Sequence, residues 1–216
     1  MLPFELIVFH NDEDACVTIG EEFSGLSGEG IKVFHRDLRY AFGSGEDFDC
    51  LVAPGNSFGI MDGGLDALIC DLYKEFGVVI QEKVWDHIQE FYSGELPVSH
   101  CVFINTGSSR RPYLAYLPTM RVPMRVTRTD NVYNAMRGLL LKLKEVNEVH
   151  PRKIKRVFCP LLGAGAGGLA VKEAARQMAF ACRSIVAGKM RFMDWEIADK
   201  VQECLGRGLG GDPDHY

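Results

Sequence analysis

Short apolar segments alternate along this chain with amphipathic segments, and this alternation limits the possible folds more than any other feature of the sequence. Segments of the first kind have the composition of buried strands and cover residues 4–9, 31–34, 49–53, 98–105, 113–117 and 155–161. Segments of the second kind repeat apolar residues every three or four positions, as helices do, and cover residues 13–23, 65–91, 132–146 and 171–185. We therefore predict an α/β protein whose sheet is covered by helices on both faces.

The predicted elements fit one domain. The 216 residues contain no internal repeat and no long linker, and one domain takes roughly 150 residues. We predict a single domain over residues 1–207 and a disordered tail over residues 208–216. A short strand over residues 191–193 is expected before a last helix that ends near Gly206.

Local breaks and caps are also expected within the helical segments. Gly77 is expected to break or kink the segment of residues 65–91. Thr129 or Asp130 is expected to cap the helix that follows.

Seven dispersed cysteines indicate a reducing compartment. No two of them have a CxxC spacing, so neither a disulfide framework nor a zinc site is expected. No apolar run approaches the roughly 18 residues of a membrane span, and the first residues lack the basic and apolar regions of a signal peptide. We expect a cytoplasmic protein without a membrane partner.

The balance of charge argues against nucleic acid as a partner. The 24 Lys and Arg residues and 29 Asp and Glu residues give a net charge of −5. Binding to a phosphate backbone releases counterions through a basic excess that this chain lacks. A small anionic ligand held by backbone amides remains compatible with the composition, because amides need no Lys or Arg.

The segment of residues 53–66 is the first candidate binding loop. It connects a buried strand to a helix and contains four glycines, Gly55, Gly59, Gly63 and Gly64. Ligands of open α/β sheets bind at the carboxyl ends of strands, and a helix N-terminus favours an anion. The alternative is a long flexible connection.

The second candidate loop, residues 162–169, carries only Gly and Ala between its two leucines. It also follows a strand and opens a helix, and its N–H donors suit a diphosphate. The alternative is a turn that packs the helix on the sheet. Gly163, Gly165 and Gly168 also satisfy GxGxxG, with Asp194 as a possible ribose ligand. This pattern leaves open a nicotinamide oxidoreductase, although too few residues follow for the rest of a dinucleotide-binding domain.

Taken together, these loops resemble those of the macrodomain family, which binds ADP-ribose. Leu51-Val52-Ala53-Pro54-Gly55-Asn56 and Gly63-Gly64-Leu65-Asp66 resemble the two parts of the family's first loop. The loop of residues 163–168 is similar to its second loop, and His35-Arg36-Asp37-Leu38 stands where the family places the Asp that binds adenine. The resemblance covers residues 30 to 190 and implies a three-layer α/β/α sandwich around a central mixed β-sheet.

The resemblance implies a role for particular residues, with ADP-ribose as ligand or substrate and no other cofactor or metal. Asp37 would accept hydrogen bonds from adenine, Asn56 would orient the distal ribose, and Asp66 would act as a general base on a water molecule. The alternatives are an Asx turn at Asp37, a turn residue at Asn56, and a helix cap or first-turn charge at Asp66. The other ligand-binding positions are Leu38, Ala53, Ser57, Phe58, Gly63, Gly64, Leu65, Gly163, Ala164, Gly165, Ala166, Gly167 and Gly168.

Several positions depart from the family pattern. Ala53 replaces the first Asn of the family, Asp62 replaces a glycine, and Gly167 replaces the aromatic residue over the distal ribose, a role that Phe58 could take. Asp62 is either a second catalytic carboxylate or a turn residue, and we favour the turn. Arg121 and Arg125 are candidates for contact with the diphosphate or with a modified protein.

The expected function is hydrolysis of an ADP-ribosyl bond, either on a mono-ADP-ribosylated acidic side chain or in an O-acyl-ADP-ribose. The partner is then ADP-ribose or an ADP-ribosylated protein. A domain that only binds ADP-ribose is the first alternative, and the oxidoreductase is the second. A module that binds RNA or poly-ADP-ribose is disfavoured by the acidic balance.

Overall fold

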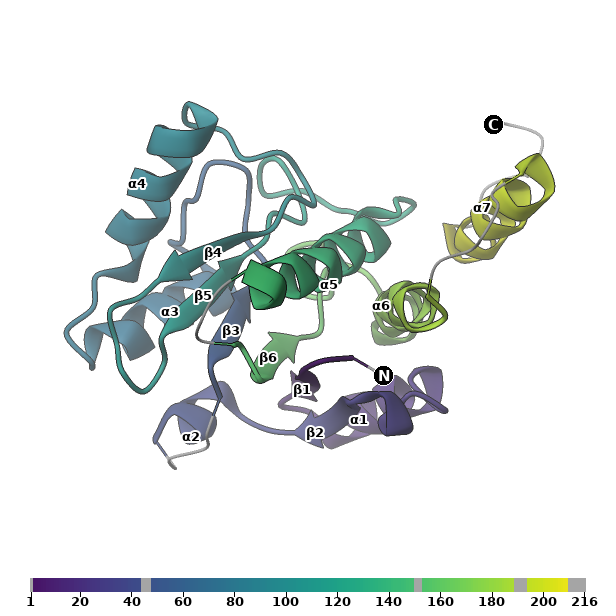
Figure 1. The fold of residues 1–216 in the computed structure, drawn as a ribbon, viewed down its shortest axis with the longest axis horizontal. Coiled ribbons are helices and arrows are strands. Elements are labelled where there is room, and N and C mark those ends of the chain that lie inside the picture. The colour runs from purple at the N-terminus through teal and green to yellow at the C-terminus, as the bar shows by residue number, and fades with distance from the viewer. Residues whose placement is uncertain (1, 44–47, 150–152, 189–193, 210–216) are drawn as a thin grey trace.

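The computed structural model describes residues 2–43, 48–149, 153–188 and 194–209. Its centre is a sheet with the strand order β2-β1-β6-β3-β5-β4 (Figure 1). The strands are β1 (Glu5–His10), β2 (Ile31–His35), β3 (Cys50–Ala53), β4 (Val102–Asn105), β5 (Tyr113–Tyr116) and β6 (Arg156–Pro160).

The sheet is mixed, because one edge strand runs against the rest. β4 pairs with β5 antiparallel, whereas all other described pairs are parallel. Parallel strands need long crossover connections, and helices supply them here. This arrangement confirms the predicted α/β/α sandwich with a mixed sheet.

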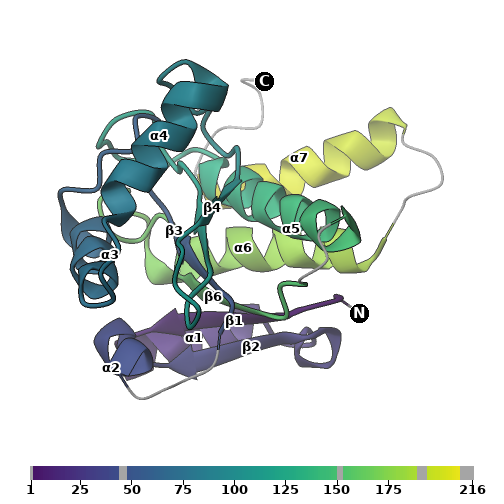
Figure 2. The same ribbon diagram turned by 60° about the vertical axis from the view of Figure 1, so that its left-hand side comes forward.

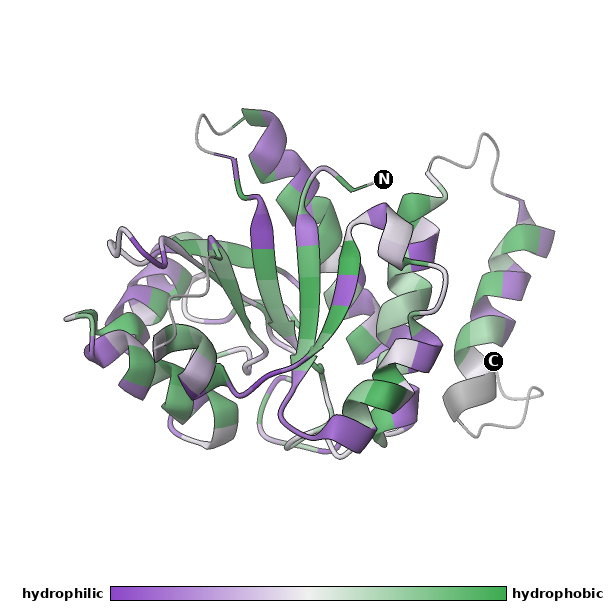
Figure 3. Ribbon diagram, turned by 90° about the horizontal axis from the view of Figure 1, so that it is seen from below, coloured by the Kyte–Doolittle hydropathy of each residue, from purple (hydrophilic) through white to green (hydrophobic). Residues whose placement is uncertain are grey.

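Side chains of each strand alternate between two hydrophobic layers. In β1, Leu6 and Val8 face one layer, while Ile7 and Phe9 face the other. All four are at most 5% exposed, which is why the strands are apolar without a polar face. In Figure 3 the central strands are mostly green and lie between helices on both sides.

Helices cover both faces of the sheet. The helices and the short 3₁₀ helix are α1 (Glu13–Glu22), η1 (Ser27–Glu29), α2 (Leu38–Gly43), α3 (Gly64–Lys74), α4 (Ile80–Tyr92), α5 (Asn131–Val149), α6 (Val171–Val186) and α7 (Trp195–Leu209). α1, α5 and α6 pack on one face and α2, α3 and α4 on the other. α7 runs outside α6 (Figure 2), where Arg176 Nη1 donates a hydrogen bond to the Cys204 carbonyl at 2.6 Å.

The structure refines several predicted boundaries. The predicted helix of residues 65–91 is two helices, α3 and α4, and Gly77 lies between them with a φ of +71°. β4 begins at Val102 rather than at residue 98, because Ser99 adopts a φ of +69° and its N–H bonds to the Pro118 carbonyl. α2 was not predicted.

Two other predictions lie largely beyond the described residues. The strand expected over residues 191–193 is outside them, and so is the expected tail from residue 210 onward. α7 continues to Leu209. None of the described helices is long and apolar enough to cross a membrane.

Candidate functional site

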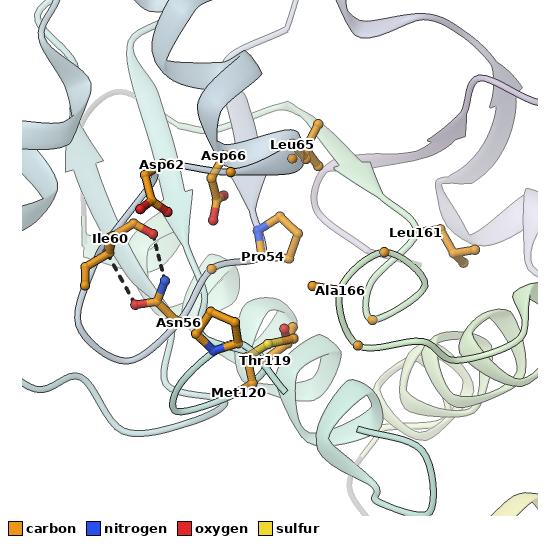
Figure 4. Close-up of a pocket in the computed structure, with 17 residues that line it drawn as sticks. Pro54, Asn56, Ile60, Asp62, Leu65, Asp66, Thr119, Met120, Leu161 and Ala166 are labelled. Carbon is orange, nitrogen blue, oxygen red and sulfur yellow. Dashed lines mark hydrogen bonds between the residues drawn. The ribbon is translucent and has the colours of Figure 1, made fainter. Parts of the chain in front are cut away.

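The two glycine-containing loops meet at the carboxyl edge of the sheet. β3 and β6 are parallel neighbours, with Leu51 opposite Phe158, so the loops that follow them leave the sheet side by side. Between them lies a pocket of about 340 Å³, which we call the distal lobe. Figure 4 shows Asp62 and Asp66 on one wall of this lobe and Ala166 on the opposite loop.

A second pocket of about 320 Å³, the proximal lobe, adjoins the first. Leu65, Leu161 and Gly165 line both lobes, so the two form one elongated groove. Asp37 and Leu38 line the proximal lobe, whereas Asp66 lines the distal lobe. Each lobe has the volume of a small-ligand site, and the groove suits a ligand with two bulky ends and a narrow middle.

Backbone amides without protein partners line the groove on both sides. Among the described residues, no hydrogen bond occupies the N–H groups of Gly163 to Gly167, or those of Gly63 to Asp66 at the start of α3. The amides of Gly168 and Leu169 bond to Gly165 and Gly163 and fix the second loop. Consecutive free amides and a helix N-terminus together favour an anion such as a diphosphate.

Only glycine fits at two positions of the second loop. A Cβ on Gly167 would lie 2.5 Å from the Gly163 carbonyl oxygen and 2.7 Å from Val126. Gly163 has a φ of +75° and packs against Val132. The aromatic residue that the family resemblance implies at position 167 therefore has no room in this loop.

Asn56 gives the first loop its shape. Its Oδ1 accepts hydrogen bonds from the N–H groups of Phe58 and Ile60, and its Nδ2 donates to the Ile60 carbonyl at 2.7 Å (Figure 4). The side chain also lines the distal lobe while being only 8% exposed. The turn that we gave as the alternative is thus present, and one amide N–H is left for a ligand.

Tyr116 anchors the same loop from the sheet, and sequence analysis did not single it out. Its hydroxyl accepts a hydrogen bond from the Asn56 N–H at 3.1 Å and donates one to the Asn56 carbonyl at 2.9 Å. Gly55 packs directly on this hydroxyl, and a Cβ there would lie 2.1 Å from it. The position of Asn56 therefore depends on the absence of a side chain at residue 55.

We expect Gly55→Ala to destabilise the protein. The added methyl must displace Tyr116, which is fully buried, and both hydrogen bonds to Asn56 would be lost. The free energy of unfolding should fall by about 2–4 kcal/mol. Urea denaturation measures this, and Gly63→Ala, whose Cβ would meet nothing within 4 Å, is the control. An equal stability of the two variants would contradict this packing.

Asp66 places a carboxylate in the lining of the distal lobe. It lies in the first turn of α3, after the N-cap residue Gly63. Its Oδ1 is shielded from solvent and accepts no hydrogen bond from the described residues. Burial, and then the negative charge of Asp62, raise the pKa of Asp66 to about 7. The side chain is therefore not a helix cap but the first-turn residue that we gave as the other alternative, and it can exchange a proton near neutral pH.

The raised pKa of Asp66 predicts a pH-dependent stability. The unfolded carboxyl has its ordinary pKa near 3.8, so the folded state binds more protons between about pH 4 and pH 7. The free energy of unfolding should fall across that window as pH rises. We expect Asp66→Asn to be more stable than the wild type at pH 8 by about 2–3 kcal/mol, and to lose this advantage near pH 4.

Urea denaturation of both proteins at several pH values measures this effect. Asp71→Asn is the control, because Asp71 lies on the same helix, is exposed and lines neither lobe. A constant difference between the wild type and Asp66→Asn at all pH values would contradict the burial of an ionisable Asp66.

Asp37 caps α2 in the structure. Its Oδ1 accepts hydrogen bonds from the N–H groups of Arg39 and Tyr40 at 2.8 and 3.3 Å. The side chain is exposed and lines the proximal lobe. The Asx turn that we gave as the alternative is present, and the second carboxylate oxygen is available to a ligand.

The structure gathers most of the predicted site residues into the groove, but not all of them. The predicted residues in its lining are Asp37, Leu38, Asn56, Gly63, Gly64, Leu65, Asp66, Gly163, Ala164, Gly165, Ala166 and Gly167. The predicted residues outside the lining are Ala53, Ser57, Phe58 and Gly168. Lining residues that were missed include Phe9, His10 and Asn11 from the end of β1, and Thr119, Met120 and Pro123 after β5.

The two arginines considered for the diphosphate lie outside the groove lining. Arg121 forms an ion pair with Glu95, with Nε 2.8 Å from Oε1. The Arg125 guanidinium covers Gly168, where a Cβ would lie 2.7 Å from its Nη1. The described residues contain no group of three or more His, Cys, Asp or Glu side chains placed to hold a metal ion.

Comparison with known proteins gives two relatives by sequence. A protein of Aeropyrum pernix, described only as uncharacterized, is 33% identical over 142 residues, which are 65% of this chain and 66% of that protein. The chain thus spans just under two thirds of that relative's length. An uncharacterized protein of Aquifex aeolicus is 30% identical over 133 residues, which are 61% of this chain and 71% of that protein.

Solved structures with the same fold include macrodomains. A mutant macrodomain of Oceanobacillus iheyensis with ADP-ribose aligns with a TM-score of 0.55 and 13% identity, over 94% of this chain and 92% of that one. The macrodomain of the same organism with ADP aligns with a TM-score of 0.53 and 15% identity, over 74% and 84%. These likenesses establish the fold. The family model described as Macro domain matches residues 52–178, more than half of the sequence, and the chain therefore belongs to the macrodomain family.

Proposed function

We propose that the protein binds ADP-ribose in the groove and hydrolyses the bond between ADP-ribose and an acceptor. One observation supports this most strongly: two rows of unpartnered backbone amides line a groove that has a pocket at each end. ADP-ribose has the matching form, with a base and ribose at one end, a diphosphate in the middle and a second ribose at the other. Two solved macrodomain structures of O. iheyensis hold ADP-ribose and ADP, respectively.

The groove sets the orientation of the ligand in this proposal. Adenine enters the proximal lobe, where the free oxygen of Asp37 accepts a hydrogen bond from the exocyclic amine. The diphosphate crosses Gly165, the residue shared by both lobes. The distal ribose then lies in the distal lobe, beside Asn56 and Asp66.

The chemistry at the distal lobe is an attack of water on the anomeric carbon of the distal ribose. The backbone amides hold the diphosphate and thereby fix the ribose. The second N–H of the Asn56 side-chain amide, which is not used by Ile60, orients the sugar. Asp66, whose pKa of about 7 lets it hold or release a proton near neutral pH, assists the proton transfer.

Two other functions remain as alternatives to this proposal. A protein that only binds ADP-ribose would have the same groove, and Asp66 would then have no catalytic role. A nicotinamide oxidoreductase would bind NAD in preference to ADP-ribose. For the proposed hydrolysis, the substrates are ADP-ribosylated proteins. We place the protein in the cytoplasm, because all seven cysteines are free thiols, as is usual in a reducing compartment.

Release of ADP-ribose tests the proposal. The purified protein is incubated with a mono-ADP-ribosylated peptide, and free ADP-ribose is followed by chromatography. We expect ADP-ribose with one oxygen from solvent when the reaction is run in ¹⁸O-water. Tight binding of the peptide without release would instead show a protein that only binds ADP-ribose.

A further inference from the structure

Two carboxylates line the same wall of the distal lobe. Asp62 lies in the loop just before the N-cap residue Gly63, and Asp66 lies four residues later, in the first turn of α3. Figure 4 shows the two side chains next to each other, with Asn56 below them.

The surroundings of the two carboxylates differ. Oδ1 of Asp66 is shielded from solvent and accepts no hydrogen bond, whereas Asp62 is exposed. Among the described residues, Asp66 interacts electrostatically with the titratable groups of Asp62, Cys70 and Tyr116, and none of these three is a cation. The described lining of the distal lobe contains no Lys, Arg or His. A proton on one of the two carboxylates therefore reduces the repulsion within the pair.

We propose that Asp62 is a second catalytic carboxylate, which accepts a proton from the attacking water while Asp66 donates its proton to the leaving group. This inference rests on the proposed hydrolysis. The division of roles follows from burial: Oδ1 of Asp66 is shielded from solvent, so this carboxyl retains its proton, whereas Asp62 is open to water. The raised pKa of Asp66 agrees with this division.

The step balances without a further reactant. The water oxygen forms a bond to the anomeric carbon, and one of its protons passes to Asp62. The bond between the anomeric carbon and the acceptor atom breaks, and the acceptor atom takes the proton of Asp66. The products are ADP-ribose and the protonated acceptor, and exchange with solvent returns a proton from Asp62 to Asp66.

The pair of Asp62 and Asp66 predicts which class of side chain carries the ADP-ribose in the substrate. An alkoxide is a poor leaving group and gains from a proton donor, whereas a carboxylate leaves without one. A departing carboxylate would also approach the negative charge of Asp62. The acceptor that fits the lobe is therefore a hydroxyl side chain, in contrast to the carboxylate-linked acceptors that the family resemblance suggests.

The test compares peptides that carry ADP-ribose on serine or on glutamate. We expect the wild type to release ADP-ribose from the serine-linked peptide with at least about a tenfold higher kcat/KM. Asp62→Asn keeps the size of the side chain and should lower kcat on that peptide by about 100-fold with little change in KM. Asp71→Asn is the matched control and should retain the wild-type rate.

The pH profile tests the interaction of Asp62 with Asp66, which a substitution with a purely structural effect would leave unchanged. The activity of the wild type should fall as the pH rises past about 7, because Asp66 then loses the proton that it donates. Asp62→Asn removes the negative charge that helps to raise the pKa of Asp66, so its activity should fall at a lower pH than that of the wild type. Unchanged kcat and an unchanged profile in this variant, or a preference for the glutamate-linked peptide, would overturn the inference and leave the hydrolysis in place. Binding of ADP-ribose without release from either peptide would overturn both, whereas absence of binding would remove the proposed function itself.

Discussion

Gly165→Val is expected to weaken the binding of ADP-ribose by at least about 100-fold, or about 3 kcal/mol, without loss of stability. Gly165 lines both lobes, so a ligand that spans the groove must cross it. A Cβ at this position meets nothing within 4 Å, and the residue does not have a positive φ. The valine side chain therefore fits the fold but fills the path of the diphosphate.

Calorimetric titration with ADP-ribose and thermal unfolding together measure this prediction. Gly28→Val is the control, because Gly28 also has open space around it and lies in η1, before β2 and outside both lobes. Unchanged affinity in Gly165→Val would mean that no ligand crosses from one lobe to the other.

Asp66→Asn is expected to lower the turnover of an ADP-ribosylated peptide by about 10²- to 10⁴-fold, the usual contribution of a general acid or base. The amide keeps the shape of the side chain but neither donates nor accepts the required proton. Because the amides that hold the diphosphate are unchanged, the affinity for ADP-ribose should stay within a few-fold of the wild type.

Initial rates and calorimetry on the same preparation separate these two effects. Asp71→Asn, which removes one negative charge from the same helix, should retain the wild-type rate. Retention of full turnover by Asp66→Asn would exclude this carboxylate from the chemistry.

The strands were predictable because buried parallel strands are nearly continuous apolar runs. β1, β3 and β6 appear in the sequence within one or two residues of their observed bounds. α2 was missed, because it has six residues and too few turns to show a period. It is helical because Ala41 and Phe42 pack into the core beside Phe48 and Tyr73.

The sheet order was not predictable, and the missed part of the groove follows from it. Local sequence does not specify which distant strands pair. Since β1 lies beside β6, the residues after Phe9 reach the proximal lobe, although nothing in the segment around His10 and Asn11 indicates a ligand.

The loops themselves were predictable from glycine and from strand-to-helix position, but side-chain roles were not. Asn56 was recognised by its place in the motif, whereas its bonds to Phe58 and Ile60 depend on the folded loop. The shielding of Asp66 from solvent likewise depends on the folded site. Phe58 lies outside the groove lining, although its place in the sequence pointed to the distal ribose.

The most direct test of the account is a calorimetric titration of the purified protein with ADP-ribose, run beside AMP and NAD. The account predicts that ADP-ribose binds at least about tenfold more tightly than either, because only ADP-ribose fills both lobes and presents a free distal ribose. Asp37→Ser, which retains a cap for α2, should weaken ADP-ribose binding. Tighter binding of NAD, or no binding of ADP-ribose, would contradict the account.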